Sequence, residues 1–226
     1  MSRFFIKVFV PGPFFEPLTY SSDKPIEAGL RVKAPLGSRE IVGISAGEAS
    51  EPQDLSTIKS ILEVLDDAPV IDPSHHALIR FASDYYLAPA GDLLLSSLPT
   101  AIRKGKPFPL AKTEQGQSQP PHYPLTDEQQ HAIDCVNQAS GNFQCFLLQG
   151  VTGSGKTQVF SELIRKTLER GKQVLLLVPE IGLTGQMVTR IQQQLTGTLA
   201  VSHSGLADGA RAKAFVAASQ GTADVL

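Results

Sequence analysis

The sequence has no tryptophan and only two cysteines and two methionines among its 226 residues. Cys135 and Cys145 are too few for a disulfide framework or a four-cysteine metal centre. These counts argue against the small disulfide-stapled and zinc-finger classes of protein. We expect both cysteines to be small, buried apolar side chains and expect no protein metal site within this sequence.

Long apolar runs are also missing. No segment approaches the roughly 18 uninterrupted apolar residues of a membrane-spanning helix. The first residues, MSRFFIKVFVPGP, alternate apolar side chains with Arg3 and Lys7. This pattern is typical of a first strand, because a signal peptide needs a longer apolar run and a small-residue cleavage site. We therefore expect a cytoplasmic protein without membrane contact.

The sequence shows no excess of basic residues, since its net charge is −2. Residues 1–110 carry 11 basic and 13 acidic side chains, and residues 111–226 carry 9 of each. Because neither half is basic, charge alone does not indicate nucleic-acid binding, and any DNA contact must come from a local patch. Arg103, Lys104 and Lys106 form one small cluster, which is also typical of a solvated linker.

Proline and glycine divide the first hundred residues into short elements. Residues 5–10, 30–33 and 40–45 have strand character between the turn signals PGP, EAGL and APLGS. The stretch STIKSILEVLDD, residues 56–67, favours an amphipathic helix or a strand–helix junction. We predict that residues 1–108 form a small, β-rich α+β domain.

A clearer helix begins after Asp72, which suits an N-cap, with Pro73 at the first helical position. Pro89 helps to end it. Four of its side chains share one face at helical spacing: Leu78, Phe81, Ala82 and Tyr85.

The chain changes character after a proline-rich segment, since residues 103–124 hold five prolines among polar residues, a linker composition. We assign the linker to residues 109–124. Beyond it, helices are expected at 125–139, 158–171 and 182–195, and apolar strands at 143–149 and 173–178. Gly171 suits the end of the second of these helices. Strands alternating with helices predict a parallel, doubly wound sheet over residues 125–226.

The stretch GVTGSGKT fits a phosphate-binding loop, because Gly150, Gly155, Lys156 and Thr157 match the spacing G-x-x-x-x-G-K-[ST] between a predicted strand and a predicted helix. Glycines let backbone N–H groups converge on phosphate oxygens, and the helix N-terminus adds its positive dipole end. Lys156 should reach the β- and γ-phosphates, and Thr157 should place its hydroxyl on Mg²⁺. The remaining loop residues are expected to contact nucleotide through their backbone: Val151, Thr152, Gly153 and Ser154.

A second acidic group for Mg²⁺ is hard to find. Glu180 follows an apolar run but comes after Pro179, and Asp224 stands in TADVL, where a strand is beginning. Neither is a convincing Walker B carboxylate. The loop therefore predicts nucleotide binding more strongly than nucleotide hydrolysis. An unrelated P-loop kinase or transferase would carry the same loop and is an alternative to the readings given below.

Three further stretches carry a family resemblance: LTDEQ (125–129), LLLVPEIGLTGQ (175–186) and VSHSGLADGARAKAF (201–215). Together with GVTGSGKT they resemble the first helicase lobe of the PriA family of bacterial replication-restart helicases. Residues 27–44, 58–72 and 84–99 resemble that family's DNA 3′-end-binding domain. The resemblance implies an incomplete RecA-like lobe, ATP and Mg²⁺ as cofactors, and ATP-dependent 3′–5′ unwinding at stalled or repaired forks. It also implies single-stranded and forked DNA with a free 3′ leading-strand end, other primosome proteins and single-strand-binding protein as partners.

By this resemblance Gln129 contacts adenine, although Thr126 and Gln129 also fit a capping box. Pro179 to Gln186 resemble the motif that lines the single-strand path, where Gly185 stands in place of the usual proline. An ordinary αβ loop capped by Thr184 is the alternative. His203, Ser204, Gly205 and Arg211 resemble the next DNA-facing motif of the family, near which Phe215 replaces a usual tryptophan. The residues of these two helicase motifs expected at DNA are Glu180, Thr184, Gln186, His203, Ser204 and Arg211.

The resemblance also implies a pocket for the last nucleotide of a 3′ end, lined by Leu18, Thr19, Gly37 and Lys59. Thr19 stands where the family often has Asp. Alternatively, PLGS is an ordinary turn and Lys59 an exposed helical lysine. Three family parts have no counterpart in this sequence: a winged-helix domain, the DEEH Walker B motif, and the second lobe with its zinc-binding cysteines. Zinc is expected only in that last part. The chain therefore reads as part of a helicase or, alternatively, as a truncated module that binds forks or 3′ ends and nucleotide without unwinding.

Overall fold

The structure is a computed structural model, and it describes residues 3–115, 124–178, 188–189, 192–193 and 197–226. The chain divides into two compact units, Met1–Phe108 (unit 1) and Pro109–Leu226 (unit 2). Each unit is described by itself.

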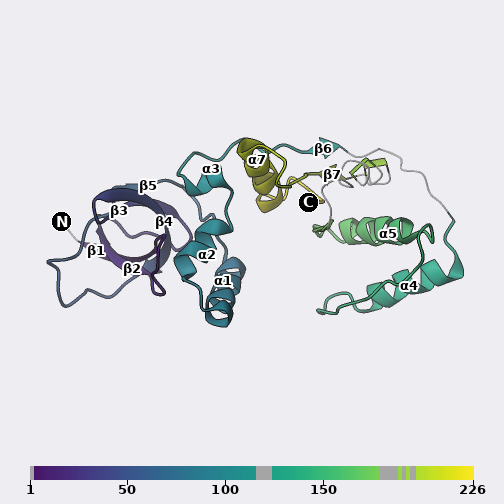
Figure 1. Ribbon diagram of the computed structural model, residues 1–226, viewed down its shortest axis with the longest axis horizontal. Helices are drawn as coiled ribbons and strands as arrows, with labels where there is room; N and C mark the ends of the chain where they lie inside the picture. The colour runs from purple at the N-terminus through teal and green to yellow at the C-terminus, as the bar shows by residue number, and fades with distance from the viewer. Residues whose placement is uncertain (1–2, 116–123, 179–187, 190–191, 194–196) are drawn as a thin grey trace. The chain divides into compact units, whose positions relative to one another are not determined.

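Unit 1 is built on a five-stranded antiparallel sheet in the order β2-β1-β4-β3-β5. Backbone bonds from Ser21 N to Lys59 O (3.0 Å) and from Ile61 N to Ser21 O (3.0 Å) join the segment before β5 to β2. The strands therefore close into a ring (Figure 1). The strands are β1 (Phe4–Phe9), β2 (Leu18–Ser22), β3 (Arg31–Leu36), β4 (Arg39–Glu48) and β5 (Glu63–Val64).

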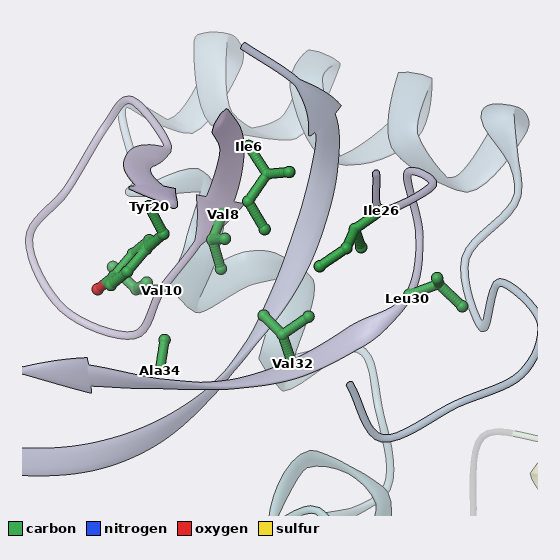
Figure 2. Close-up of a cluster of buried hydrophobic side chains, with 8 residues drawn as sticks. All are labelled: Ile6, Val8, Val10, Tyr20, Ile26, Leu30, Val32 and Ala34. Carbon is green, nitrogen blue, oxygen red and sulfur yellow. The ribbon is translucent and has the colours of Figure 1, made fainter. Parts of the chain in front are cut away.

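The interior of this ring is the core of unit 1. Alternate residues of each strand point inward, as the two-residue period of a strand requires. Figure 2 shows these side chains converging from separate strands. The expected strands at 5–10, 30–33 and 40–45 are confirmed as β1, β3 and β4. The core cluster is Ile6, Val8, Val10, Tyr20, Ile26, Leu30, Val32 and Ala34.

The helix expected within residues 56–67 is wrong. The only named element there is the two-residue strand β5, and the backbone around it pairs with neighbouring strands. Leu62 N donates to Lys33 O at 2.8 Å, and Leu65 N donates to Arg31 O at 2.9 Å. Closing the ring satisfies these backbone groups, and this tertiary pairing overrides the local helical pattern.

Three helices adjoin the ring: α1 (Pro73–Tyr86), α2 (Ala90–Ser96) and α3 (Thr100–Arg103). The predicted start of α1 is confirmed, because the Asp72 carboxylate accepts from His75 N at 2.7 Å. The predicted apolar face is not its buried face. Leu78, Phe81 and Tyr85 are 60%, 61% and 69% exposed, and Ile79 is the buried residue of the helix.

In the described part of unit 2, the helices are α4 (Asp127–Gln138), α5 (Lys156–Glu169) and α7 (Asp208–Ser219). α4 and α5 lie side by side (Figure 1). Gly171 follows α5 in the left-handed conformation, as predicted for a helix end. β6 (Glu114–Gln115) from the predicted linker pairs with β7 (Thr198–Leu199). The predicted helix at 182–195 falls mainly outside the described residues.

Within the described part of unit 2, the parallel pairs are the single bridges Val174 with Val225 and Leu199 with Val225. The segment expected as a strand at 173–178 pairs with the C-terminal residues through Leu176 N to Leu226 O (2.8 Å) and Leu226 N to Val174 O (2.9 Å). Leu175 and Leu177 are 64% and 81% exposed. The strand predicted at 143–149 is not formed. Phe143 and Leu147 are 100% and 91% exposed, and Cys145 is exposed rather than buried. An apolar strand needs a paired neighbour to cover it, and none of the described segments pairs with this one.

Candidate nucleotide and nucleic-acid sites

The phosphate-loop sequence forms a tight backbone turn that leads into α5. Gly155 is the N-cap of α5 and adopts φ 82°, in the left-handed region that glycine tolerates. At Gly150 an added Cβ would lie 2.6 Å from Ser154 Oγ, so a side chain there would collide with the loop. The positive φ of Gly155 therefore favours glycine at this position, whereas the close atom at Gly150 belongs to the rotatable side chain of Ser154.

Lys156 turns back into this loop. Its ammonium group donates to Gly150 O at 2.6 Å and to Val151 O at 2.9 Å. Thr157 is the next residue of the first turn of α5, beside the positive end of the helix dipole. A cation, a hydroxyl and the free N–H groups of a helix start therefore gather at one place, which is the donor set that phosphate groups and Mg²⁺ require.

Gln129 links α4 to this loop. Its Oε1 accepts from Thr126 N at 3.0 Å, and Gln129 N donates to Thr126 Oγ1 at 3.3 Å, so the predicted capping box is confirmed. Its Nε2 donates to Ser154 O at 3.1 Å. An added Cβ at Gly155 would lie 2.3 Å from this Nε2. Gln129 thus caps one helix and contacts the loop that begins the next.

The predicted DNA-facing residues of unit 2 divide into two groups. Glu180, Thr184 and Gln186 lie outside the described residues. His203 and Ser204 lie in the turn before α7, and Arg211 lies in its first turn, where it pairs with Asp208 at 2.6 Å. His203 Nδ1 and Arg211 Nε are buried and have no hydrogen-bond partner within the described part of the chain. These two atoms are donors or acceptors available at a helix start.

Asp224, one of the two weak Walker B candidates, has a local structural role. Its carboxylate accepts from Thr198 N at 2.6 Å and from Thr198 Oγ1 at 2.8 Å. It therefore joins the backbone segments that bridge at Val225. The second candidate, Glu180, lies outside the described residues.

Two of the predicted 3′-end residues of unit 1, Gly37 and Lys59, lie in contact. Lys59 Nζ donates to Gly37 O at 2.9 Å, so the lysine reaches the turn between β3 and β4. Gly37 adopts φ 61°, and an added Cβ would meet nothing within 4 Å, which leaves open space beside the turn. Leu18 and Thr19 begin β2, whose Ser21 bonds to Lys59 O. Lys59 is exposed but lies on no helix, so the helical alternative is wrong.

Unit 1 contains a buried ion pair, Arg31 with Asp66, that the sequence analysis did not predict. Arg31 is 1% exposed and binds the Asp66 carboxylate through Nη2 at 2.6 Å and Nε at 2.9 Å. Its Nη1 donates to Ile102 O at 2.6 Å and Lys106 O at 2.9 Å, and its guanidinium lies over the Phe108 ring at 4.6 Å. We call this group the Arg31 clamp. No sequence pattern marked it, because an arginine within a strand is usually exposed.

Two kinds of feature are absent from the described residues. No helix there is long and apolar enough to cross a membrane. No group of three His, Cys, Asp or Glu side chains in that part of the chain is arranged to hold a metal ion.

Comparison with known protein families gives one match for each unit. Residues 7–99 match the family of the 3′ DNA-binding domain (3′BD) of PriA. Residues 126–226 match the DEAD/DEAH box helicase family. The chain therefore combines a DNA-binding domain of this type with a helicase domain.

Curated relatives carry the name of the same family. The chain is 36% identical over 188 residues to the replication restart protein PriA of Treponema pallidum, which covers 81% of this chain and 28% of the relative. It is 27% identical over 283 positions to that of Haemophilus influenzae, covering 91% of this chain and 38% of the relative. Over 88 residues it is 48% identical to that of Bacillus subtilis, covering 38% of this chain and 11% of the relative.

These matches define a DNA-binding helicase class. The chain belongs to the PriA family and spans about a third of the length of the first two relatives. The Haemophilus alignment has 283 positions, more than the 226 residues of this chain, so that relative has residues with no counterpart here.

Proposed function

We propose that this chain is a DNA 3′-end-binding and nucleotide-binding part of an ATP-dependent 3′–5′ helicase that restarts replication at stalled or repaired forks. Residues 1–108 would bind the free 3′ leading-strand end, residues 109–124 would be the linker, and residues 125–226 would form the first part of a RecA-like lobe. The observation that carries the proposal is the loop before α5, where the Lys156 ammonium group lies beside Gly150 O and Gly155 caps the helix start, which supports phosphate binding there.

The roles of the loop residues follow from their positions. Backbone N–H groups of residues 150–156 and the start of α5 would bind the phosphates of ATP. Lys156 would exchange its bonds to two loop carbonyl groups for bonds to phosphate oxygens. Thr157 would hold Mg²⁺, which supplies charge neutralisation at the phosphates when bound. The bond from Gln129 Nε2 to Ser154 O supports a position beside the proposed nucleotide site, where Gln129 would contact adenine.

The DNA roles are likewise proposals. Leu18, Thr19, Gly37 and Lys59 would form the pocket for the terminal nucleotide, and the bond from Lys59 to Gly37 O supports a shared site for two of them. Glu180, Thr184, Gln186, His203, Ser204 and Arg211 would contact the single strand. Primosome proteins, single-strand-binding protein and a cytoplasmic location belong to the same proposal, and zinc would belong only to the further region of complete relatives.

A binding module without turnover is the second candidate. It is favoured by Asp224, whose carboxylate is engaged by Thr198 and is not available as a Walker B ligand in this arrangement. ATP binding and ATP hydrolysis by the 226-residue chain, measured with and without forked DNA, separate the two. Turnover stimulated by DNA supports the helicase motor. Nucleotide binding without turnover supports the module, and an absence of nucleotide binding contradicts both.

A further inference from the structure

Unit 1 contains a cleft that none of the sites above uses. It has a volume of about 720 Å³ and lies between β3 and β4 of the ring and the helices α2 and α3. Ile41, Val42 and Leu95 supply apolar surface to its wall. Arg103 and Lys104 line it from the end of α3, and Glu40 lines it from β4.

The two cations from α3 are exposed and have no ion-pair partner in the described part of the chain. The only side-chain hydrogen bond given for Arg103 is a long one, 3.5 Å, to Thr100 Oγ1. Lys33, a third cation of the cleft, differs because Glu63 binds it at 2.7 Å. The cleft therefore offers two cations without an ion-pair partner beside an apolar wall. Two carboxylates also line it, Glu40 and Asp92, and Asp92 accepts from Gly12 N at 2.8 Å.

The buried side chain of Arg31 holds the backbone on both sides of these two cations. The two carbonyl groups that the Arg31 clamp holds, Ile102 O and Lys106 O, lie on either side of Arg103, Lys104 and Gly105. Gly105 adopts φ 78°, and an added Cβ there would lie 3.1 Å from Val42 Cγ2. The buried Arg31 thus holds the backbone of Arg103, Lys104 and Gly105 against β4. A solvated linker run would not need such anchoring, because burying a guanidinium is unfavourable unless its bonds are satisfied.

We infer that this cleft is a second DNA site of unit 1, which binds one nucleotide of a single strand, with its phosphate at Arg103 and Lys104 and its base against the apolar wall. The cations complement a phosphate, and the wall of Val42 and Leu95 complements the face of a base. Glu40 supplies an acceptor for an exocyclic amine. Nucleic acid suits the cleft better than an acidic peptide, because one nucleotide joins a negative group to a flat apolar ring within a cleft of this size.

This inference rests on the proposed 3′-end site and extends it along the strand. Glu40 lies on the same hairpin as Gly37, three residues further along, which is about 10 Å at the strand rise of about 3.3 Å per residue. A DNA strand whose last nucleotide lies at Gly37 and Lys59 would reach the cleft within its next few nucleotides.

The test measures binding of the whole 226-residue chain to fluorescein-labelled single strands of two and eight nucleotides with a free 3′ hydroxyl. The variant is Arg103→Ala/Lys104→Ala, and its charge-matched control is Lys24→Ala/Arg80→Ala, which removes two exposed cations outside the cleft. We expect the cleft variant to bind the eight-nucleotide strand about five- to tenfold more weakly and the dinucleotide unchanged. Its slope of log affinity against log salt should fall by about 0.7, which corresponds to one phosphate contact on a single strand. The control should match the unaltered protein.

Three outcomes overturn the inference. Equal affinity of the cleft variant and its control for the longer strand means that the cations do not contact DNA. A dinucleotide loss as large as the octanucleotide loss means that they act at the terminal nucleotide itself. In a direct comparison, an acidic peptide that binds the unaltered chain but not the cleft variant, and that the eight-nucleotide strand does not displace, means that the partner is a peptide. A Lys59→Ala variant keeps the proposals distinct: if it retains full dinucleotide affinity, the proposed 3′-end site fails, whatever the cleft variant does.

Discussion

Lys156 is the residue on which the nucleotide proposal depends most directly. Its ammonium group lies inside the loop, bonded to two carbonyl oxygens within 3 Å. Substitution by alanine removes this cation without altering either motif glycine. The exposed surface of the loop suggests that the fold tolerates the change.

The Lys156→Ala variant is expected to lose nucleotide affinity by about two orders of magnitude, because charge-assisted bonds to phosphate are each worth about 1.5–3 kcal/mol. Titration of a fluorescent ATP analogue measures this. Lys166→Ala, later on the same helix, is the matched control and should bind normally. Binding of DNA 3′ ends should be unchanged in both variants, and equal loss of both activities would show that the units do not act independently.

The Arg31 clamp makes the second prediction at this scale. Removing one partner of a buried, hydrogen-bonded ion pair leaves the other charge unpaired, and such changes cost about 3–5 kcal/mol. Arg31→Met should destabilise unit 1 by this amount, measured by urea denaturation followed by circular dichroism. Arg31→Met/Asp66→Leu should recover part of the loss, because no unpaired carboxylate then remains. A single variant as stable as the unaltered protein would contradict the account of the clamp.

At the scale of elements, α1 contacts β1 through an aromatic pair. The rings of Phe9 and His76 lie 5.5 Å apart at 54°. Burial of the imidazole, with a smaller contribution from His75, lowers the pKa of His76 below its usual value of 6.5. The folded form therefore favours the neutral ring.

This direction fixes the sign of a pH effect. A folded pKa below the unfolded one gives stability that is fully present above pH 6.5 and is lost as the pH falls below it. The melting temperature of unit 1 should therefore be lower at pH 5.5 than at pH 7.5. His76→Phe, which keeps a ring against Phe9, should weaken this dependence, whereas His131→Asn in unit 2 should retain it. An unchanged dependence in His76→Phe would refute the assignment.

The elements also show what the sequence could and could not predict. Periodicity and caps located β1, β3, β4, α1, α4 and α5, because those signals are local to each element. The helix predicted at 56–67 is wrong because the backbone groups of that segment form hydrogen bonds to neighbouring strands when the ring closes. The strand predicted at 143–149 failed because an apolar run specifies a strand only where a neighbour pairs with it. The shared face of Leu78, Phe81 and Tyr85 on α1 is exposed, and Ile79 is the buried residue, since periodicity does not say which face of a helix meets the core.

The candidate sites follow the same rule. The phosphate loop could be predicted because its residues are contiguous and each has a backbone reason. The approach of Lys59 to Gly37 followed only from family resemblance, as 22 positions separate them. The Arg31 clamp joins residues 31, 66, 102, 106 and 108, a set that only the three-dimensional fold brings together.

At the scale of the whole molecule, the account assigns two binding activities to two units of one chain. Unit 1 is a closed ring of strands with its own buried core. Unit 2 carries the proposed nucleotide-binding loop between α4 and α5. In the family to which the chain belongs, these regions are the 3′ DNA-binding domain and the helicase domain.

The most direct test of the central claim is the affinity of the 226-residue chain for a DNA fork whose 3′ leading-strand end carries either a free hydroxyl or a phosphate. Fluorescence anisotropy at one fixed salt concentration measures both. The account predicts about tenfold tighter binding of the free end, equivalent to about 1.4 kcal/mol, and loss of this preference in Lys59→Ala but not in Lys156→Ala. Equal affinity for the two forks in a folded sample would contradict it.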